Sequence, residues 1–97
     1  MISNQILQNT IEGIKTISRM ELCVVDIDGK VIATSSPDMD KYAATALNFA
    51  QSPADSQEVQ GCQFFKIYDG QQLEYILVAG GSGEATYTLG KMAAFQI

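Results

Sequence analysis

The stretch Cys23–Ser35, with the sequence CVVDIDGKVIATS, decides the fold of this chain. It contains two short runs rich in Val, Ile and Thr, one on each side of Asp28-Gly29. β-Branched residues favour strands, and an Asp-Gly pair tolerates the positive φ angles of a two-residue hairpin turn. The stretch therefore predicts two antiparallel strands, over residues 21–27 and 30–35, joined by a tight turn.

A second hairpin is indicated by the stretch CQFFKIYDGQQLEYILVAGG at residues 62–81. Its apolar runs, Phe64–Tyr68 and Leu73–Ala79, flank another Asp-Gly pair, Asp69-Gly70. The preceding SPADSQ, residues 52–57, is typical of a loop, and Val59 is expected to begin a short strand. The two hairpins and this strand predict one antiparallel sheet of about five strands.

Three helices are expected around this sheet. Residues 2–18 carry apolar side chains at helical spacing, which predicts an amphipathic helix. Ser36-Pro37 has the form of an N-cap followed by proline at the first helical position, so a second helix is predicted from there to about residue 50. After a glycine turn at residues 80–83, the spacing favours a third helix. Since the chain reaches Ile97 without a C-cap, we expect this helix to continue in a longer protein.

The same spacing predicts which helix faces are packed. The apolar face of the first helix comprises Ile2, Ile6, Leu7, Ile11, Ile14 and Ile17, and the opposite face carries Gln8, Glu12, Lys15 and Arg19. The second helix has Met39, Tyr42, Ala43, Ala46, Leu47, Phe49 and Ala50 on one side. In the third, Ala85, Leu89, Met92, Ala93 and Gln96 share a face.

These elements follow one another in the order αββαβββα. A chain of 97 residues buries a single core, so residues 1–97 are expected to form one domain. The order predicts an α+β fold, in which helices flank an antiparallel sheet of about five strands, of the roadblock, PAS or profilin kind. Folds of this kind serve many functions, so the fold class does not identify the activity.

The composition argues against several classes of function. A net charge of −5, with only six Lys and Arg, disfavours direct contact with nucleic acid, because phosphate binding requires clustered basic residues. No apolar run approaches the roughly 20 residues of a membrane-spanning helix. The N-terminal MISNQILQNTIEGIK has no positive charge before Lys15, unlike a signal peptide. We therefore expect a cytoplasmic protein without membrane contact.

Asp26 and Asp28 invite a catalytic interpretation. Their D-x-D pattern after an apolar run is similar to the nucleophile strand of haloacid-dehalogenase-like phosphatases, which also need Mg²⁺ and further carboxylates. Lys30 stands where such motifs carry Thr or Val, and no later Asp pair follows. An EF-hand loop would require Gly at the position of Val31 and Glu at that of Pro37. We therefore expect Asp26 to be a solvated or turn-bonding carboxylate.

The remaining motifs favour structural roles. The stretch GGSGEATYTLGK at residues 80–91 lacks the spacing of a Walker A or dinucleotide-binding loop, although a weak anion site at the helix start stays open. Cys23 and Cys62, in a chain without histidine, predict two buried free thiols rather than a zinc site. We expect no catalytic residue, metal or cofactor. Five aromatic residues either fill the core or line a small-molecule pocket: Tyr42, Phe64, Phe65, Tyr68 and Tyr75.

Three runs carry a resemblance to a known family: MISNQILQNTIEGIKTISRMELCVVDIDGKVIATS, SPADSQEVQGCQFFKIYDGQQLEYILVAGG and LGKMAAFQI. Over essentially its whole length, the chain resembles the N-terminal domain of bacterial transcription regulators related to the sugar-diacid and purine-catabolism regulators. In that family a central module and a DNA-binding helix-turn-helix follow, so the resemblance implies a regulatory domain. Sugar-diacid domains typically carry Asp-Pro-x-Arg-Ile-Gly and His-Glu-Gly after the first hairpin. Here SSPDMDKYAATA places Met39 at the arginine and offers no histidine, so neither residue is carried over.

Together these observations predict a non-catalytic domain that binds an unknown small metabolite and transmits a shift through its C-terminal helix. Position and polarity place the candidate ligand-binding residues between the sheet and the second helix: Thr34, Ser35, Ser36, Tyr42, Lys66 and Tyr68. The alternative is a ligand-free homodimerisation module of roadblock type, which pairs through sheet edges or helices. The two interpretations are compatible, and a homodimer is expected.

Overall fold

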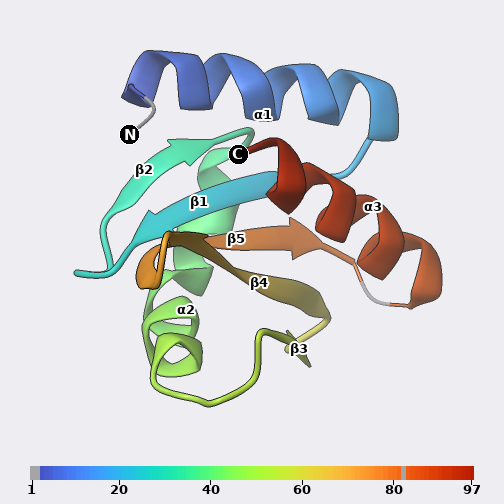
Figure 1. The fold of residues 1–97 in the computed structure, drawn as a ribbon. Coiled ribbons are helices and arrows are strands. Elements are labelled where there is room, and N and C mark those ends of the chain that lie inside the picture. The colour runs from blue at the N-terminus through green and yellow to red at the C-terminus, as the bar shows by residue number, and fades with distance from the viewer. Residues whose placement is uncertain (1–2, 82) are drawn as a thin grey trace.

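The computed structural model describes residues 3–81 and 83–97, and it confirms the predicted α+β fold as three layers. The predicted packing of Ile2 lies outside these ranges. A five-stranded antiparallel sheet, in the order β2-β1-β5-β4-β3, forms the middle layer (Figure 1). The elements are α1 (Asn4–Ser18), β1 (Leu22–Asp26), β2 (Val31–Thr34), the 3₁₀ helix η1 (Pro37–Tyr42), α2 (Ala43–Ala50), β3 (Ser56–Val59), β4 (Cys62–Asp69), β5 (Gln72–Gly80) and α3 (Glu84–Gln96).

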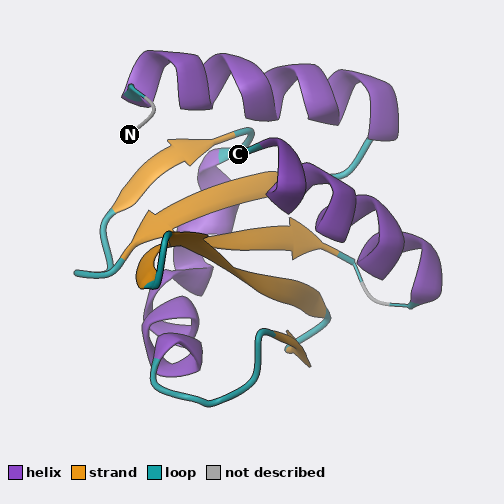
Figure 2. Ribbon diagram, in the orientation of Figure 1, coloured by secondary structure: helices purple, strands orange, loops and turns teal. Residues whose placement is uncertain are grey.

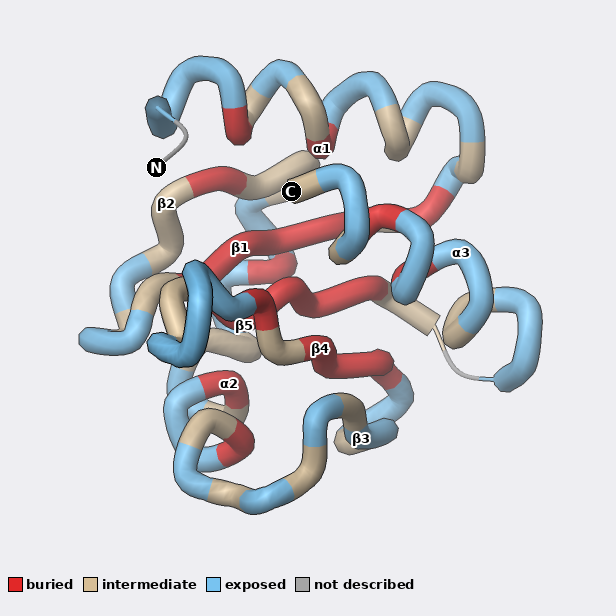
Figure 3. The backbone as a smooth tube through the Cα atoms, viewed as in Figure 1, coloured by how far each residue is buried: buried red, intermediate tan, exposed pale blue. Residues whose placement is uncertain are grey.

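Helices cover both faces of the sheet, and each face has its own apolar core (Figure 2). On one face α1 and α3 supply Leu7, Ile11 and Ala93, which pack with strand residues such as Phe65 and Leu77. On the other face η1 and α2 bury a separate cluster, which includes Met39, Ala46, Phe49, Cys23, Val25, Cys62 and Phe64. The central strands β1, β5 and β4 are therefore mostly buried, whereas the outer helix surfaces are exposed (Figure 3).

The turn chemistry differs in detail from the expected two-residue turn at Asp28-Gly29. The first hairpin has a three-residue loop, Ile27-Asp28-Gly29, because the Asp26 N–H donates to the Lys30 carbonyl at 2.9 Å. Gly29 takes φ +86° at the last loop position, where such loops favour glycine. The second hairpin does have a two-residue loop, but it is Gly70-Gln71, since Asp69 still pairs with Gln72.

A third hairpin joins β3 to β4, and the sequence analysis did not predict it. Val59 was expected to begin a strand, but it ends one: Ser56–Val59 pairs with Cys62–Phe65. The loop is Gln60-Gly61, whose φ angles of 54° and 79° have the signs of a type I′ turn. The prediction of a loop over residues 52–57 was therefore wrong for Ser56 and Gln57.

The face of α1 was predicted only in part. Leu7 and Ile11 are fully buried, whereas Ile6 and Ile17 are 55% and 88% exposed. Gln8, expected on the opposite face, instead bonds the edge strand β2. Its Nε2 donates to the Thr34 carbonyl at 2.7 Å, and its Oε1 accepts from the Thr34 N–H at 3.0 Å. This side chain thus replaces a neighbouring strand along part of the β2 edge.

Candidate functional site

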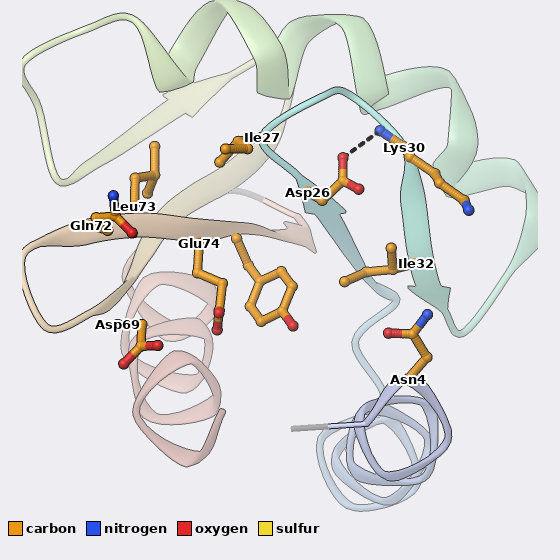
Figure 4. Close-up of a pocket in the computed structure, with 10 residues that line it drawn as sticks. Asn4, Asp26, Ile27, Lys30, Ile32, Asp69, Gln72, Leu73 and Glu74 are labelled. Carbon is orange, nitrogen blue, oxygen red and sulfur yellow. Dashed lines mark hydrogen bonds between the residues drawn. The ribbon is translucent and has the colours of Figure 1, made fainter. Parts of the chain in front are cut away.

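The candidate site is a cavity of about 390 Å³ at one end of the sheet (Figure 4). Antiparallel pairing places the end of β1 beside the start of β5, because Asp26 lies opposite Tyr75. The β1–β2 and β4–β5 loops therefore meet at this end, next to the start of α1. We call it the hairpin-end cavity, and it is lined by Asn4, Asp26, Ile27, Lys30, Ile32, Asp69, Gln72, Leu73, Glu74 and Tyr75.

The hairpin itself holds the Asp26 carboxylate in place. Asp26 Oδ1 accepts hydrogen bonds from the backbone N–H groups of Asp28 and Lys30, both at 2.9 Å. The bond from Lys30 is visible in Figure 4. The expected turn-bonding role of Asp26 is therefore confirmed. Because both of these bonds reach Oδ1, the second oxygen, Oδ2, is left for another partner.

Tyr75 forms the floor of the cavity and is only 6% exposed. Its hydroxyl forms no hydrogen bond with any residue of the described ranges, and its oxygen is not among the fully buried atoms without a partner, so it is open to the cavity. Burial raises the pKa of Tyr75, and the nearby charges of Glu74, Asp26 and Asp69 raise this pKa further. The phenol is therefore a neutral group, close to three carboxylates.

Carboxylates from two hairpins dominate the charge of the cavity. In Figure 4, Asp69 and Glu74 lie on one side, and Asn4, Lys30 and Ile32 lie on the other. Lys30 is exposed, and its side chain leads away from the Asp26 carboxylate. The described parts of the chain contain one ion pair, between Lys15 Nζ and Glu21 Oε1 at 3.3 Å, and it lies outside this cavity. No basic side chain of these parts therefore neutralises Asp26, Asp69 or Glu74.

Three of the predicted ligand-binding residues, Thr34, Ser35 and Ser36, lie together at the end of β2, where their polar groups already have partners. Thr34 Oγ1 donates to the Ser36 carbonyl at 2.6 Å, and Ser36 Oγ accepts from the Asp38 N–H as the expected N-cap. Ser35 Oγ donates to Glu21 Oε1 at 2.6 Å and accepts from the Leu22 N–H at 2.8 Å. The bond from Ser35 lowers the pKa of Glu21, with a smaller contribution from Lys15. These hydroxyls hold β2 and η1 to β1.

The other three predicted residues lie elsewhere. Tyr42 packs edge-on against Phe64, with ring centroids 6.4 Å apart. Lys66 Nζ donates to the Ser52 carbonyl and lies 5.2 Å from the centre of the Phe49 ring. Lys66 and Tyr68 also line a shallow cavity of about 250 Å³ beside Asp55. The hydroxyl of Tyr68 donates to Asp55 Oδ1 at 3.4 Å.

The six predicted residues therefore do not share one site. Strands β1 and β5 separate β2 from β4. The group Thr34, Ser35 and Ser36, called the serine cluster below, therefore lies about 14 Å across the sheet from the Lys66–Tyr68 pair. A cavity does lie where the pocket was expected, between α2 and the sheet, but Thr45, Asn48, Phe49, Ser52, Gln57, Val59 and Gln60 line it. Ligand binding by the six residues stays a prediction.

Of the aromatic residues, which were expected either to fill the core or to line a pocket, some do the first and some do both. Phe64 and Phe65 are 0% and 3% exposed and belong to the two cores. Tyr75 belongs to a core and also lines the hairpin-end cavity. Sequence reasoning did not predict this cavity, although both hairpins were recognised. A possible signal was the placement of carboxylates at both hairpin ends, Asp26 in the first and Asp69 and Glu74 in the second.

Cys23 and Cys62 are buried free thiols, as predicted. Burial raises the pKa of Cys23 to about 12, so its thiol stays protonated at neutral pH. In residues 3–81 and 83–97, no group of three or more Cys, Asp or Glu side chains is arranged to hold a metal ion. None of the helices in these ranges combines the length and the apolar character needed to cross a bilayer.

Comparison with known proteins gives no relationship: no protein-family model matches this chain, and no curated protein matches it significantly.

Proposed function

We propose that this chain is a non-catalytic, small-molecule-sensing domain of a cytoplasmic transcription regulator, whose DNA-binding helix-turn-helix lies outside the chain. The observation that carries the proposal is the hairpin-end cavity. Its volume of about 390 Å³ suits a small metabolite, and it combines apolar walls with a few convergent polar groups. The negative net charge supports the assignment of DNA contacts to another domain.

Helix α1 offers a route from the cavity to the C-terminal helix. Asn4, at its start, lines the cavity. Leu7 and Ile11 pack in the same core as Ala93 of α3. Ile14, in the C-terminal half of α1, also lies against α3. A ligand that contacts Asn4 therefore acts on a rigid element that also contacts α3.

Native mass spectrometry of the purified chain, alone and after incubation with a metabolite mixture, tests the proposal. We expect a complex whose extra mass disappears on denaturation. Tyr75→Phe removes only the cavity hydroxyl, so it should weaken the complex. Tyr68→Phe makes the same chemical change outside the cavity and should not. The proposed site is contradicted if the chain shows no bound small molecule, either after purification or after incubation with the metabolite mixture. It is also contradicted if Tyr75→Phe and Tyr68→Phe weaken the complex equally.

A second candidate function, homodimerisation, is favoured by an exposed apolar surface on the other side of α1. Ile17 and Phe95 are 88% and 89% exposed, and Met92 and Leu89 are 61% and 39% exposed. Ile14 and Ile17 line a groove of about 180 Å³ with Leu89, Met92 and Ala93. Exposed apolar surfaces of this kind are typical of interaction sites, and in a two-fold dimer the same surface serves both partners. We propose that a second copy of the chain covers this α1–α3 surface.

Sedimentation equilibrium tests the dimer. Met92→Lys should shift the protein toward the monomer, because it places a charge in the apolar contact. Leu47→Lys introduces the same charge at an apolar position of α2 that is 37% exposed and lies outside this surface, so it is the control and should leave the mass unchanged. A strict monomer at millimolar concentration would refute dimerisation through any surface.

A further inference from the structure

We infer that the hairpin-end cavity recognises a small organic cation, such as a protonated amine, rather than the dicarboxylate that the family resemblance suggests. This inference rests on the proposed ligand-binding function and specifies the chemical class of the ligand. Three features carry it: unneutralised carboxylates, a tyrosine hydroxyl that is open to the cavity and has no partner among the described residues, and apolar walls.

The carboxylates come from three different positions around the cavity. Asp26 is fixed by two backbone hydrogen bonds to one oxygen, which leaves its other oxygen free to accept. Asp69 and Glu74 face the cavity from the other hairpin (Figure 4). Lys30, the one basic residue among the described residues that line the cavity, is exposed and its side chain leads away from Asp26. A dianion would meet repulsion here, whereas a cation gains charge-assisted hydrogen bonds.

The Tyr75 hydroxyl is an independent indication of a ligand. The residue is 94% buried, it lines the cavity, and no residue of the described ranges accepts or donates a hydrogen bond at its oxygen. Among the described residues, the fully buried side-chain polar atom without a partner is Ser52 Oγ and not the Tyr75 oxygen. The Tyr75 hydroxyl is therefore open to the cavity, where a bound molecule can form a hydrogen bond with it. An ammonium group can donate to this oxygen and to a neighbouring carboxylate at the same time.

The walls argue for an organic ligand and against a bare metal ion. Ile27, Ile32 and Leu73 contribute apolar surface to the cavity, which suits the carbon skeleton of a small molecule. The carboxylates do not form a metal-binding group in the parts of the chain that the structure describes. Asn4 adds one uncharged polar side chain from α1, which can bond a hydroxyl or a second amine.

The test is a ¹H–¹⁵N NMR titration of the whole chain with two matched series of compounds. Putrescine, 1,4-butanediol and succinate share a four-carbon skeleton, and glucosamine, glucose and glucarate share a six-carbon one. We expect at least one amine to shift the amide signals of residues 26–30 and 72–75, with an affinity at least about tenfold above its neutral and anionic counterparts. The double variant D69N/E74Q should lose this affinity by about tenfold or more. The double variant D38N/D40N changes the charge equally on η1, on the opposite face of the sheet, and should retain it.

The outcomes distinguish the proposed preference for a cation from the proposed sensing function. If glucarate, succinate or a neutral compound shifts the cavity signals and neither amine does, the cation is refuted and the sensing function stands. If neither amine shifts these signals and the metabolite mixture yields no complex in the mass spectrum, both proposals are wrong. Equal losses in the two double variants would show a general charge effect and would also overturn the specific site.

Discussion

Gly90 allows α3 to pack closely against the sheet, and replacing it by alanine should destabilise the protein. A Cβ atom at this position would lie 2.5 Å from Cε2 and 2.8 Å from Cζ of Phe65, and 3.3 Å from the Cβ of Ala79. Phe65 is 3% exposed and its ring packs against Tyr87, with centroids 5.8 Å apart. The ring therefore cannot move aside without disturbing α3.

Gly90→Ala has two opposing effects, and their magnitudes decide whether the substitution stabilises or destabilises the protein. Alanine favours a helix interior over glycine by about 1 kcal/mol. Forcing an extra carbon into a well-packed core costs about 1–3 kcal/mol, and the 2.5 Å approach lies well inside normal contact distance. We expect a net loss of about 1 kcal/mol or more in the free energy of unfolding, equivalent to a fall of about 4–8 °C in Tm for a domain of this size.

Urea denaturation of Gly90→Ala and Gly13→Ala measures this difference directly. Gly13 lies within α1, and a Cβ there would meet nothing within 4 Å. Gly13→Ala should therefore stabilise the protein by about 0.5–1 kcal/mol, because only the helix preference acts. Gly90→Ala should cost less in a Phe65→Leu background than in the natural chain if the ring is the obstacle, which a double-mutant cycle measures. A Gly90→Ala protein as stable as Gly13→Ala would refute the packing of α3 described above.

Three further predictions concern α1, the serine cluster and the buried thiol. Gln8→Ala removes both bonds to Thr34 and should lower the free energy of unfolding by about 1–2 kcal/mol in a urea titration. The control is Gln5→Ala, whose side chain bonds Asn9 on the helix surface, and it should lower the free energy of unfolding by about 0.2–0.5 kcal/mol. Ser35→Ala should raise the pKa of Glu21 in an NMR titration of the side-chain carboxyl, because the hydrogen bond from Ser35 is the main cause of the lowered pKa. An unchanged pKa would contradict this cause, and Ser36→Ala is the control. Cys23 should react with a thiol reagent only when the protein unfolds. Its folded-state pKa of about 12 exceeds the ordinary 9.0, so only the unfolded state loses the proton between these values. The stability from this group is therefore complete below pH 9 and declines as the pH rises toward 12, and Cys23→Ala should remove this part of the decline.

Local patterns predicted most of the fold because the responsible interactions are local. The Asp-Gly pairs marked two hairpins, and Ser36-Pro37 marked a helix start whose N-cap bond is present. The first six residues of that helix, Pro37–Tyr42, are 3₁₀, which their spacing did not reveal. The third hairpin was missed because Gln60-Gly61 places a glutamine, rather than the usual Asn or Asp, at a positive φ angle.

Packing between distant elements was less predictable. The spacing in α3 grouped Leu89 and Met92 with Ala93 as one face, yet Gly90 and Ala93 are buried and Met92 is largely exposed. Small residues permit close contact with the sheet, and a pattern of apolarity alone does not identify them. The hairpin-end cavity was missed for a similar reason. It exists because β1 pairs with β5, and this long-range pairing brings Asp26 next to Tyr75.

Helix α1 connects the principal features of the proposed sensor. At about 1.5 Å per residue, the ten-residue step from Asn4 at the cavity to Ile14, which contacts α3, spans about 15 Å. In the proposed sensor, a ligand that displaces α1 must first break the two Gln8 bonds to Thr34, which together stabilise the docked helix by about 1–2 kcal/mol. A ligand shifts such an equilibrium only by its difference in affinity for the two states, and each tenfold difference supplies about 1.4 kcal/mol. A ligand that binds the displaced state about 10–30-fold more tightly would therefore offset these two bonds, and Gln8→Ala should lower the affinity difference that the ligand needs.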